Sequence, residues 1–391
     1  MSFRLGSQDR ERLNRPIDEA YGLPGETYTD PAYFRLEQER IFRRTWVCAG
    51  HITDIPDKGD ITAVSVGGAP IMLVHGQDGE PRAFHNICRH KGNVLVEGSR
   101  KKQRTIVCGY HCWTYTLDGR LSATPNFGGT GKEWHGTARR KEDLGLRPVR
   151  LYDWHGWLFV TLDEEADDFE EHAAPLIACL ESYDFSDLRL AAETDFVFEA
   201  NWKLTFENFF DCYHIPYIHV NSLARRNEAL YVSGKTVMDS VRRATVEGPL
   251  FPIIYDYPAE SEEAHFGMPI PDSMPREWRT RIVYLHFFPN VLMFVQPDHI
   301  VSIIETPVAP DRAHQKLKIF FHGDAAFGDD LAARRKHCVE FWSMINAEDI
   351  DVCRTLQAGR GSPVFDGGIF APAWESQVHA FQQRVADYMA R

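Results

Sequence analysis

Apolar and polar positions change their spacing along the chain, and these changes divide it into segments with different predicted structure. Near the amino terminus, apolar residues recur at helical spacing after a stretch of turn residues at 22–25. Thr29 or Asp30 is suited to cap this helix, and Pro31 is suited to its first turn. We therefore expect a helix near the start of the chain.

From about residue 60 to 162, short apolar runs alternate with turn signals. The runs ITAVSV, IMLVHG and PRAFHNI are separated by Gly67-Gly68 and by Gln77-Asp78-Gly79, and Asp118-Gly119 separates two later runs. Short apolar runs joined by such residues are typical of antiparallel hairpins. WLFVTL at 157–162 is typical of a buried strand. Residues 45–163 are therefore predicted to form an all-β domain.

A different pattern follows the acidic stretch DEEADDFEE at 163–171, which we interpret as a domain boundary. Runs rich in β-branched and aromatic residues lie at 281–289, 291–296, 300–308 and 316–323, and residues 329–359 have helical periodicity. We expect residues 164–391 to form a second domain, an antiparallel sheet flanked by helices, with the helical segment 1–44 packed on it. The predicted fold class is α+β.

Composition excludes several functions. Lys and Arg number 43 against 56 Asp and Glu, which gives a net charge of −13 and argues against a nucleic-acid-binding protein. No apolar run is long enough to span a membrane, and the charged amino terminus does not resemble a secretory signal. We therefore expect a cytoplasmic protein. Its eight cysteines are too few for a disulfide framework in a chain of 391 residues and are available to bind metals.

Two short motifs in the predicted β domain each combine one cysteine with one histidine. They are Cys88-Arg89-His90 and Cys108-Gly109-Tyr110-His111. A structural zinc site usually groups its thiolates together, whereas here each of two loops would supply one sulfur and one nitrogen. That arrangement suits a [2Fe–2S] cluster in which two Cys hold one iron and two His hold the other. A zinc site is the alternative.

These motifs resemble the Rieske domain, through C-R-H-K-G at 88–92 and C-G-Y-H-C-W-T-Y at 108–115. The resemblance implies a Rieske [2Fe–2S] cluster bound by Cys88, His90, Cys108 and His111. Cys112 stands where the family commonly has Gly, and the first loop offers it no disulfide partner. The sequence therefore fits the oxygenase type of Rieske domain, which lacks that disulfide.

A second constellation contains His214 and His219, which lie five positions apart. On an unbroken helix, with about 100° per residue, the two imidazoles would point about 140° apart and could not readily share one ion. Pro216 disfavours helix at the residue before it, so we expect His214 to end a helix and His219 to turn back from the next segment. The two imidazoles could then converge on one metal.

A carboxylate in the late helix could complete this metal site. Asp349 lies on the apolar stripe of the helix, four residues after Ile345, whereas Asp351 points elsewhere and is expected to be solvated. A carboxylate on a buried face needs a strong partner such as a metal. Two His and one carboxylate are typical of a non-haem iron site with positions open for oxygen and substrate.

This half of the chain resembles the catalytic domain of Rieske non-haem iron oxygenases, through NWKLTFENFFDCYHIPYIH at 201–219 and EDIDVCRTLQAGRGSP at 348–363. The resemblance implies that His214, His219 and Asp349 bind a mononuclear Fe(II). It further implies that Asp211 is the catalytic bridging acid between a cluster histidine and an iron histidine. Family members are homotrimers with electron transfer between subunits, so Asp211 would act across an interface.

The implied function is that of a terminal oxygenase. It would use O2 and electrons from a separate reductase, and possibly a ferredoxin, to hydroxylate a small organic substrate. No G-x-G-x-x-G fingerprint follows a predicted strand, so we expect NAD(P)H to bind the reductase. The basic run 100–104 is expected to be a solvated hairpin tip, although it could steer an acidic ferredoxin.

The substrate is predicted from aromatic residues within 209–294, which suit either stacking of a planar ring or cation–π binding of a quaternary ammonium. The main prediction is aromatic ring hydroxylation, as in aromatic hydrocarbon catabolism, and the alternative is N-demethylation or oxidation of a quaternary ammonium compound. A prediction of another class is a Rieske electron-transfer protein. The aromatic residues in question are Phe209, Phe210, Tyr217, Tyr231, Phe251, Tyr255, Tyr257, Phe266, Tyr284, Phe287, Phe288 and Phe294.

Overall fold

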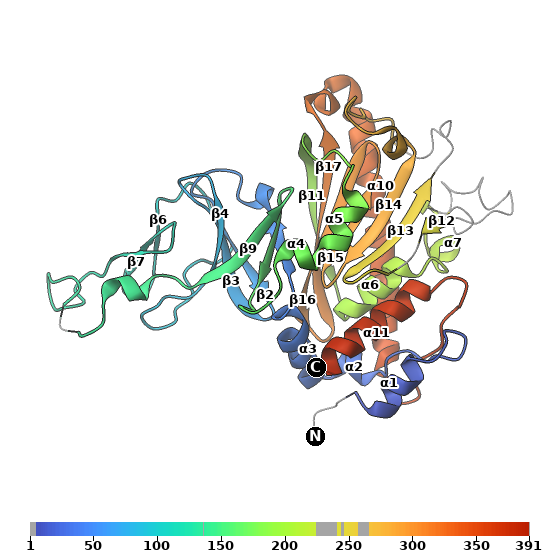
Figure 1. The fold of residues 1–391 in the computed structure, drawn as a ribbon, viewed down its shortest axis with the longest axis horizontal. Coiled ribbons are helices and arrows are strands. Elements are labelled where there is room, and N and C mark those ends of the chain that lie inside the picture. The colour runs from blue at the N-terminus through green and yellow to red at the C-terminus, as the bar shows by residue number, and fades with distance from the viewer. Residues whose placement is uncertain (1–4, 136, 224–240, 244–245, 257–265, 391) are drawn as a thin grey trace. The chain divides into compact units, whose positions relative to one another are not determined.

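The structure of the chain is a computed structural model, and it describes residues 5–135, 137–223, 241–243, 246–256 and 266–390. The chain separates into two compact units. The β unit comprises Phe42–Ala166, and the α+β unit comprises Met1–Ile41 together with Asp167–Arg391. Each unit is described below by itself, and Figure 1 shows the elements of both.

The β unit contains a seven-stranded antiparallel sheet in the order β1-β10-β9-β4-β3-β2-β5 and a three-stranded sheet in the order β6-β7-β8. The predicted hairpins are present, since β2 pairs with β3 around Gly67-Gly68 and β7 pairs with β8 around Asp118-Gly119. Gly67 and Gly68 have φ of 55° and 72°, a conformation that glycine adopts without steric cost. The strands of this unit are β1 (Val47–His51), β2 (Ile61–Val66), β3 (Ala69–His75), β4 (Pro81–His85), β5 (Ser99–Arg100), β6 (Thr105–Val107), β7 (Thr114–Thr116), β8 (Leu121–Ala123), β9 (Pro148–Trp154) and β10 (Trp157–Thr161).

The sheet of the α+β unit is also antiparallel, with seven strands in the order β11-β17-β16-β15-β14-β13-β12. All four apolar runs identified in the sequence form strands of this sheet, from β14 to β17. Its strands are β11 (Leu188–Phe198), β12 (Val241–Arg243), β13 (Leu250–Asp256), β14 (Arg281–Phe287), β15 (Val291–Val295), β16 (His299–Ala309) and β17 (Arg312–His322).

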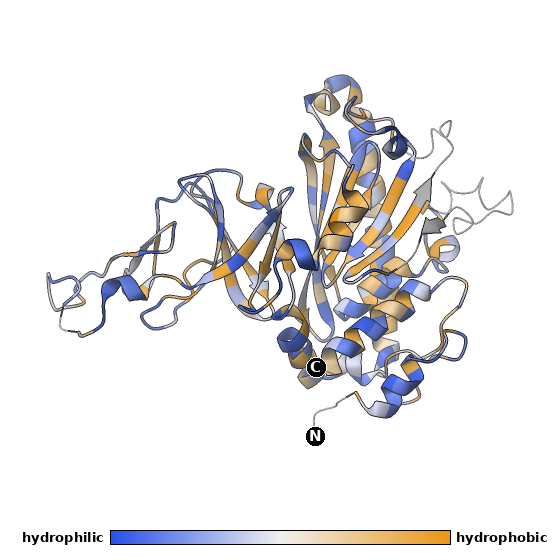
Figure 2. Cartoon of the chain, viewed as in Figure 1, coloured by the Kyte–Doolittle hydropathy of each residue, from blue (hydrophilic) through white to orange (hydrophobic). Residues whose placement is uncertain are grey.

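Helices accompany this sheet, and three of them gather beside it in Figure 1: α6, α10 and α11. Helix α6 contacts α10, α11 and strand β16. Hydrophobic residues are frequent along β13 and β14, whereas α11 mixes hydrophobic and hydrophilic residues, as Figure 2 shows. The helices of the α+β unit are α1 (Ser7–Leu13), α2 (Glu26–Thr29), α3 (Pro31–Glu37), α4 (Phe169–His172), α5 (Ala174–Leu180), α6 (Trp202–Phe210), α7 (Ile215–Ile218), α10 (Ala332–Arg360) and α11 (Ser376–Ala390). The predicted fold class, α+β, is confirmed.

The amino-terminal helices are joined to α6 by buried polar contacts. Asp30 caps α3, where its carboxylate accepts hydrogen bonds from the first-turn backbone. The Lys203 Nζ lies 2.6 Å from Glu37 Oε1, and Trp202 Nε1 donates to Glu37 Oε2 at 3.0 Å. The side chains of Glu37, Trp202 and Lys203 are all fully buried. Trp202 and Lys203, which belong to the 201–219 motif, therefore position α6 rather than contact a ligand.

None of the helices in the described part of the chain combines the length and apolar character needed to cross a membrane.

Candidate functional site

Two loops of the β unit, 88–93 and 108–113, have the same backbone arrangement. In each loop the cysteine N–H donates to the carbonyl five residues on, at 2.8 Å, and the cysteine carbonyl accepts from the N–H four residues on, at 2.9 and 3.0 Å. The fourth residue after each cysteine has positive φ, 75° at Gly92 and 55° at Cys112. Cys112 thus adopts a backbone conformation that is uncommon for a residue with a side chain. The two loops therefore hold their cysteines in the same backbone arrangement, although the histidine follows two residues later in the first loop and three residues later in the second.

The side chains of these loops converge as four possible ligands. Cys88 and Cys108 are buried in the core, and the Tyr115 hydroxyl lies 3.3 Å from the Cys88 sulfur. The rings of His90 and His111 are 4.7 Å apart between centroids. Burial raises the pKa of the Cys88 thiol, so its thiolate needs a cation nearby. His90 Nδ1 is buried without a hydrogen-bond partner, as expected of an atom that binds a metal. Two thiols and two imidazoles of this kind fit a [2Fe–2S] cluster.

In the α+β unit, the local structure around the second histidine pair differs from the sequence-based expectation. Helix α6 ends at Phe210, and His214 begins the one-turn helix α7 instead of ending a helix. Pro216 lies in the first turn of α7, where its missing N–H costs nothing. His214 and His219 therefore stand at the two ends of α7, and this brings them together.

Asp349, from helix α10, joins the two histidines. The three side chains place ligand atoms within 4.8 Å of one another. His214 Nε2 and His219 Nε2 are 3.0 Å apart, and Asp349 Oδ1 lies 3.5 Å and 3.4 Å from them, respectively. For metal–ligand bonds of about 2.1 Å, neighbouring ligands of one ion stand roughly 3 Å apart or slightly more. The three atoms therefore fit a single ion.

The protons of the two histidines also favour a cation at this point. His214 Nδ1 contacts the Asp211 carbonyl, and His219 Nδ1 lies 2.8 Å from Glu348 Oε2. Because both partners are acceptors, each Nδ1 carries the proton and each Nε2 presents a lone pair. Two lone pairs face each other at 3.0 Å beside Asp349 Oδ1, which accepts no hydrogen bond. A metal cation between them would satisfy all three atoms at once.

The electrostatics of His214 point the same way. Burial lowers the pKa of this imidazole, but the neighbouring Asp211 and Asp349 raise it by more, so that the pKa is about 9. The electrostatic environment of the site therefore favours a cation. Two imidazoles and one carboxylate that leave other positions open form the donor set typical of non-haem iron.

The structure places the other candidate acids as follows. Asp211 is the residue at which α6 ends; its carboxylate accepts from the Tyr213 N–H at 2.7 Å and lies 3.7 Å from His214 Nδ1. Its side chain is 26% exposed. The side chain of Asp351 is 86% exposed and pairs with Arg354 at 3.3 Å, so Asp351 is solvated as expected.

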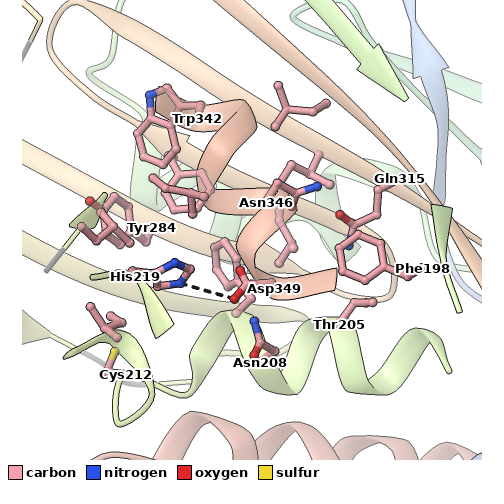
Figure 3. Close-up of a pocket in the computed structure, with 18 of the residues that line it drawn as sticks. Phe198, Thr205, Asn208, Cys212, His219, Tyr284, Gln315, Trp342, Asn346 and Asp349 are labelled. Carbon is pink, nitrogen blue, oxygen red and sulfur yellow. Dashed lines mark ion pairs between the residues drawn. The ribbon is translucent and has the colours of Figure 1, made fainter. Parts of the chain in front are cut away.

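A cavity lies beside the metal site, between the sheet and helices α6 and α10. Its volume is about 90 Å³, enough for a small ligand. Figure 3 shows His219 and Asp349 facing into it. Its lining residues are Phe198, Thr205, Asn208, Phe209, Cys212, Ile215, His219, Leu223, Ile253, Tyr284, Leu292, Phe294, Ile303, Gln315, Leu317, Trp342, Ile345, Asn346 and Asp349.

Four of the lining residues form an aromatic wall, which we define as Phe209, Tyr284, Phe294 and Trp342. The ring of Phe294 is central: its centroid lies 5.0 Å from Phe209, 4.8 Å from Tyr284 and 4.4 Å from Trp342. These distances are typical of interacting aromatic pairs. The wall therefore lines the cavity beside the metal site with packed aromatic rings.

Only some of the aromatic residues proposed from the sequence line this cavity. Phe209, Tyr284 and Phe294 do, whereas four others pack in the core and Tyr217 is 68% exposed. The four core residues are Phe210, Phe251, Phe287 and Phe288. Tyr231 and Tyr257 lie outside the described residues, as does the side chain of Tyr255. The cavity also contains Phe198 and Trp342, which lie outside the 209–294 segment.

A buried polar chain holds the indole of Trp342 in the aromatic wall. Trp342 Nε1 donates to His299 Nε2 at 2.8 Å, and His299 Nδ1 lies 2.6 Å from Asp298 Oδ1. The other oxygen of Asp298 accepts from the backbone N–H of Phe266 and Met268, at 2.9 and 3.1 Å. The Asp298 carboxylate favours a protonated imidazole, but the indole N–H can only donate, so His299 Nε2 must be unprotonated. Asp298 and His299 thus determine the orientation of Trp342.

Sequence reasoning missed Glu348, His299 and Trp342. Glu348 accepts from both His219 and Ser222 Oγ, the latter at 2.6 Å, and so orients the His219 imidazole. Its position directly before Asp349 was the only signal for it. His299 follows Asp298 in a strand that otherwise resembles ordinary core, and nothing in the spacing connects it to Trp342.

The basic run 100–104 is partly neutralised within the β unit. Lys101 Nζ lies 3.1 Å from the buried Asp60 carboxylate, and Lys102 Nζ lies 3.9 Å from Asp57. Both lysines remain more than half exposed. The Lys102–Asp57 pair, exposed on both sides, contributes little to stability.

Comparison with known proteins identifies both units. Residues 45–132 match the Rieske [2Fe-2S] domain, and residues 185–391 match the catalytic domain of the ring hydroxylating alpha subunit. The chain is 30% identical over 402 residues to the glycine betaine monooxygenase oxygenase subunit of Chromohalobacter salexigens, a match that covers 94% of this chain and 86% of that protein.

Solved structures show the same fold. A quaternary ammonium Rieske monooxygenase, studied for carnitine oxidation by gut microbiota and inter-subunit electron transfer, superposes with a TM-score of 0.76 at 25% identity and covers 99% of this chain and 100% of its own. Naphthalene 1,2-dioxygenase from Rhodococcus, bound to indole, has a TM-score of 0.75 at 21% identity and covers 98% and 99%. The fold alone therefore does not choose between cationic and aromatic substrates.

Proposed function

Because the chain belongs to the Rieske non-haem iron oxygenases, in the family of ring-hydroxylating alpha subunits, we propose that its substrate is a small quaternary ammonium compound that loses an N-methyl group. The predicted terminal oxygenase, which uses O2 and reductase-supplied electrons, is confirmed by this membership. The alternative of a pure electron-transfer protein is wrong, because the chain contains a catalytic domain over residues 185–391.

The ligands of the two metal groups are part of this proposal. Cys88, His90, Cys108 and His111 would hold the Rieske cluster. His214, His219 and Asp349, two imidazoles and one carboxylate, would hold the mononuclear iron. When bound, the cluster supplies single electrons and the iron supplies the activation of O2. The chain's own contribution is to orient these ligands and to shape the cavity beside them.

The observation that carries the substrate proposal is the aromatic wall beside the metal site. A quaternary ammonium has no N–H to donate, so π faces are its natural binding surface. Among the described lining residues there is no Lys or Arg to repel a cation. Two relatives described above are named for glycine betaine or for quaternary ammonium substrates, which supports the same choice.

The proposed reaction balances as follows. One oxygen atom of O2 enters an N-methyl C–H bond, and the other leaves as water after two electrons and two protons are supplied. The resulting hydroxymethyl ammonium breaks its C–N bond and releases formaldehyde and a protonated tertiary amine. No protein nucleophile is required.

Electron delivery between subunits is a further part of the proposal. Asp211 is partly exposed and contacts His214 through its carbonyl, so it is well placed to connect the iron site to a cluster outside its own unit. We propose a homotrimer in which Asp211 bridges to a cluster histidine of a neighbouring subunit, with a reductase, or a ferredoxin between them, as the electron donor.

The test is oxygen uptake by the purified chain with NADH and a generic Rieske-oxygenase reductase. Trimethylammonium compounds and aromatic acids are supplied in parallel, and formaldehyde, phenols and cis-diols are measured. We expect formaldehyde in step with oxygen uptake from at least one trimethylammonium compound. Asp349→Ala should abolish turnover but leave the red-brown cluster absorbance unchanged.

The aromatic wall also suits a planar ring, so aromatic ring hydroxylation is the second candidate. A phenol or cis-diol from an aromatic acid, with no formaldehyde from any trimethylammonium compound, would establish that candidate and refute the first.

A further inference from the structure

Buried polar atoms without partners gather at one end of the cavity. We call this the polar end and define it as the lining residues Thr205, Gln315 and Asn346, together with Glu305, which contacts Thr205 and Gln315. Figure 3 shows the three lining residues at the end away from Tyr284 and His219. Gln315 Oε1, Asn346 Nδ2 and Glu305 Oε1 are all buried without a hydrogen bond. All three residues are more than nine-tenths buried, so bulk water does not satisfy these atoms.

The hydrogen bonds around Glu305 determine what the polar end presents. Glu305 and Gln315 are directly opposed on neighbouring strands β16 and β17, and Gln315 Nε2 donates to Glu305 Oε2 at 2.8 Å. The Thr205 hydroxyl donates to the Trp202 carbonyl at 2.7 Å and also contacts Glu305 Oε2. Since a hydroxyl has one proton, Glu305 can supply the proton of the second contact, as a neutral acid.

Burial supports this neutral form, because it raises the pKa of Glu305 to about 8. When Glu305 is ionised, or when its proton is directed to the Thr205 hydroxyl, Glu305 Oε2 accepts from the Gln315 amide nitrogen, and this sets the amide orientation. Gln315 Oε1 is therefore the free atom, an acceptor on the cavity surface. Asn346 adds an amide with a free donor.

We infer that the polar end binds a hydroxyl group of the substrate. A hydroxyl can accept from the Asn346 amide and donate to Gln315 Oε1, which satisfies both free atoms at once. A carboxylate has no proton to donate, and among the described lining residues no Lys or Arg would neutralise it. An alkyl end would leave both buried amides unpaired.

This inference rests on the proposed function and specifies its substrate class: a hydroxylated trimethylammonium compound, with its cationic head toward the aromatic wall and its hydroxyl group toward the polar end. It also distinguishes this chain from its glycine betaine-oxidising relative, whose named substrate ends in a carboxylate. The hydrogen-bonding capacity of the polar end, and not the fold, would select a hydroxyl-ended substrate over a carboxylate-ended one.

Three probes that differ only in the far end test the inference: choline, with a hydroxyl; glycine betaine, with a carboxylate; and ethyltrimethylammonium, with an alkyl end. We measure kcat/KM for formaldehyde release with the complete electron-transfer system. We expect choline to exceed ethyltrimethylammonium by about tenfold or more, because a site built for a hydroxyl group rejects the analogue without it.

Variants of the polar end assign the effect to these residues. Gln315→Met keeps the length of the side chain but removes the acceptor, so the preference for choline over ethyltrimethylammonium should shrink toward unity. Glu305→Gln retains an uncharged group and should keep the preference. Ile303→Val, elsewhere in the cavity, is the matched control, and it should change all three probes by a similar factor.

The outcomes separate the two claims. Equal kcat/KM for the three probes, or a loss in Gln315→Met that is the same for choline and ethyltrimethylammonium, would overturn the hydroxyl site while the proposed demethylation stands. A clear preference for glycine betaine would do the same. No formaldehyde from any of the three would overturn the proposed function and the hydroxyl site with it.

Discussion

The polar chain behind Trp342 allows a sharp test, because the two nitrogens of His299 have different tasks. Nε2 accepts from the indole of Trp342, at 2.8 Å, and Nδ1 donates to Asp298, at 2.6 Å. An Asn side chain reaches about as far as Nδ1, and a Gln side chain reaches about as far as Nε2. His299→Asn should therefore lose the indole contact, and His299→Gln should lose the contact to Asp298.

Both variants should destabilise the protein by similar amounts. In His299→Asn the indole N–H of Trp342, whose residue is 2% exposed, is left unpaired at a cost of about 1–3 kcal/mol. In His299→Gln the fully buried Asp298 loses one charge-assisted hydrogen bond, worth about 1.5–3 kcal/mol, but keeps its two backbone donors. Stability alone would therefore not distinguish the variants.

Function should distinguish them. Without its acceptor, the Trp342 ring is free to leave its 4.4 Å contact with Phe294, and such a pair is worth about 0.5–1.5 kcal/mol. If that energy is lost from substrate binding, KM rises about two- to twelvefold in His299→Asn. His299→Gln keeps the ring in place and should keep KM within about twofold of the parent.

The assay combines thermal unfolding with steady-state demethylation and the ratio of formaldehyde formed to O2 consumed. We expect a lower ratio in His299→Asn only, because a displaced ring leaves the substrate poorly positioned. His322→Gln serves as a control, since His322 is buried and bonded to Tyr183 but lies outside the cavity lining. Equal KM and equal coupling in His299→Asn and His299→Gln would refute a positioning role for this chain of contacts.

Three further predictions concern metal binding and pH. Glu348→Ala should weaken iron binding about 10- to 100-fold, because it leaves His219 Nδ1 without its acceptor. Glu348→Gln should retain most of the iron affinity. The iron content of each variant after dialysis against a chelator is the measurement. Asp349→Asn should lose mononuclear iron, while Asp351→Asn, at a solvated position of the same helix, should keep the iron content of the parent in the same metal analysis. Burial lowers the pKa of His286 to about 3, so the folded state excludes a proton that the unfolded chain binds below about pH 6.5. Stability should therefore fall as pH drops from 6.5 toward 3, by up to about 1.4 kcal/mol per pH unit from this residue, and His286→Phe should show a shallower decline in melting temperature between pH 7 and 5.

Much of the architecture could be predicted because local patterns carry it. The Gly67-Gly68 and Asp118-Gly119 turns have short-range conformational preferences, so they indicated hairpins without knowledge of the rest of the chain. The periodicity of the late helix distinguished Asp349 from Asp351, because burial on one face is a property of spacing alone. The prediction that His214 ends a helix was wrong. Pro216 disfavours helix at the residue before it, but it also suits the first turn of a new helix, and His214 begins that helix.

The sequence by itself determined the donor types of both metal sites, because thiolate, imidazole and carboxylate chemistry is a property of residue identity and short spacing. Only the tertiary structure decided which groups surround those donors. Glu348 behind His219, His299 behind Trp342, and the opposed pair Glu305 and Gln315 depend on contacts between separate strands and helices. Such contacts have no local signature, because a buried hydrogen bond is selected by where two elements meet and not by the spacing within either one.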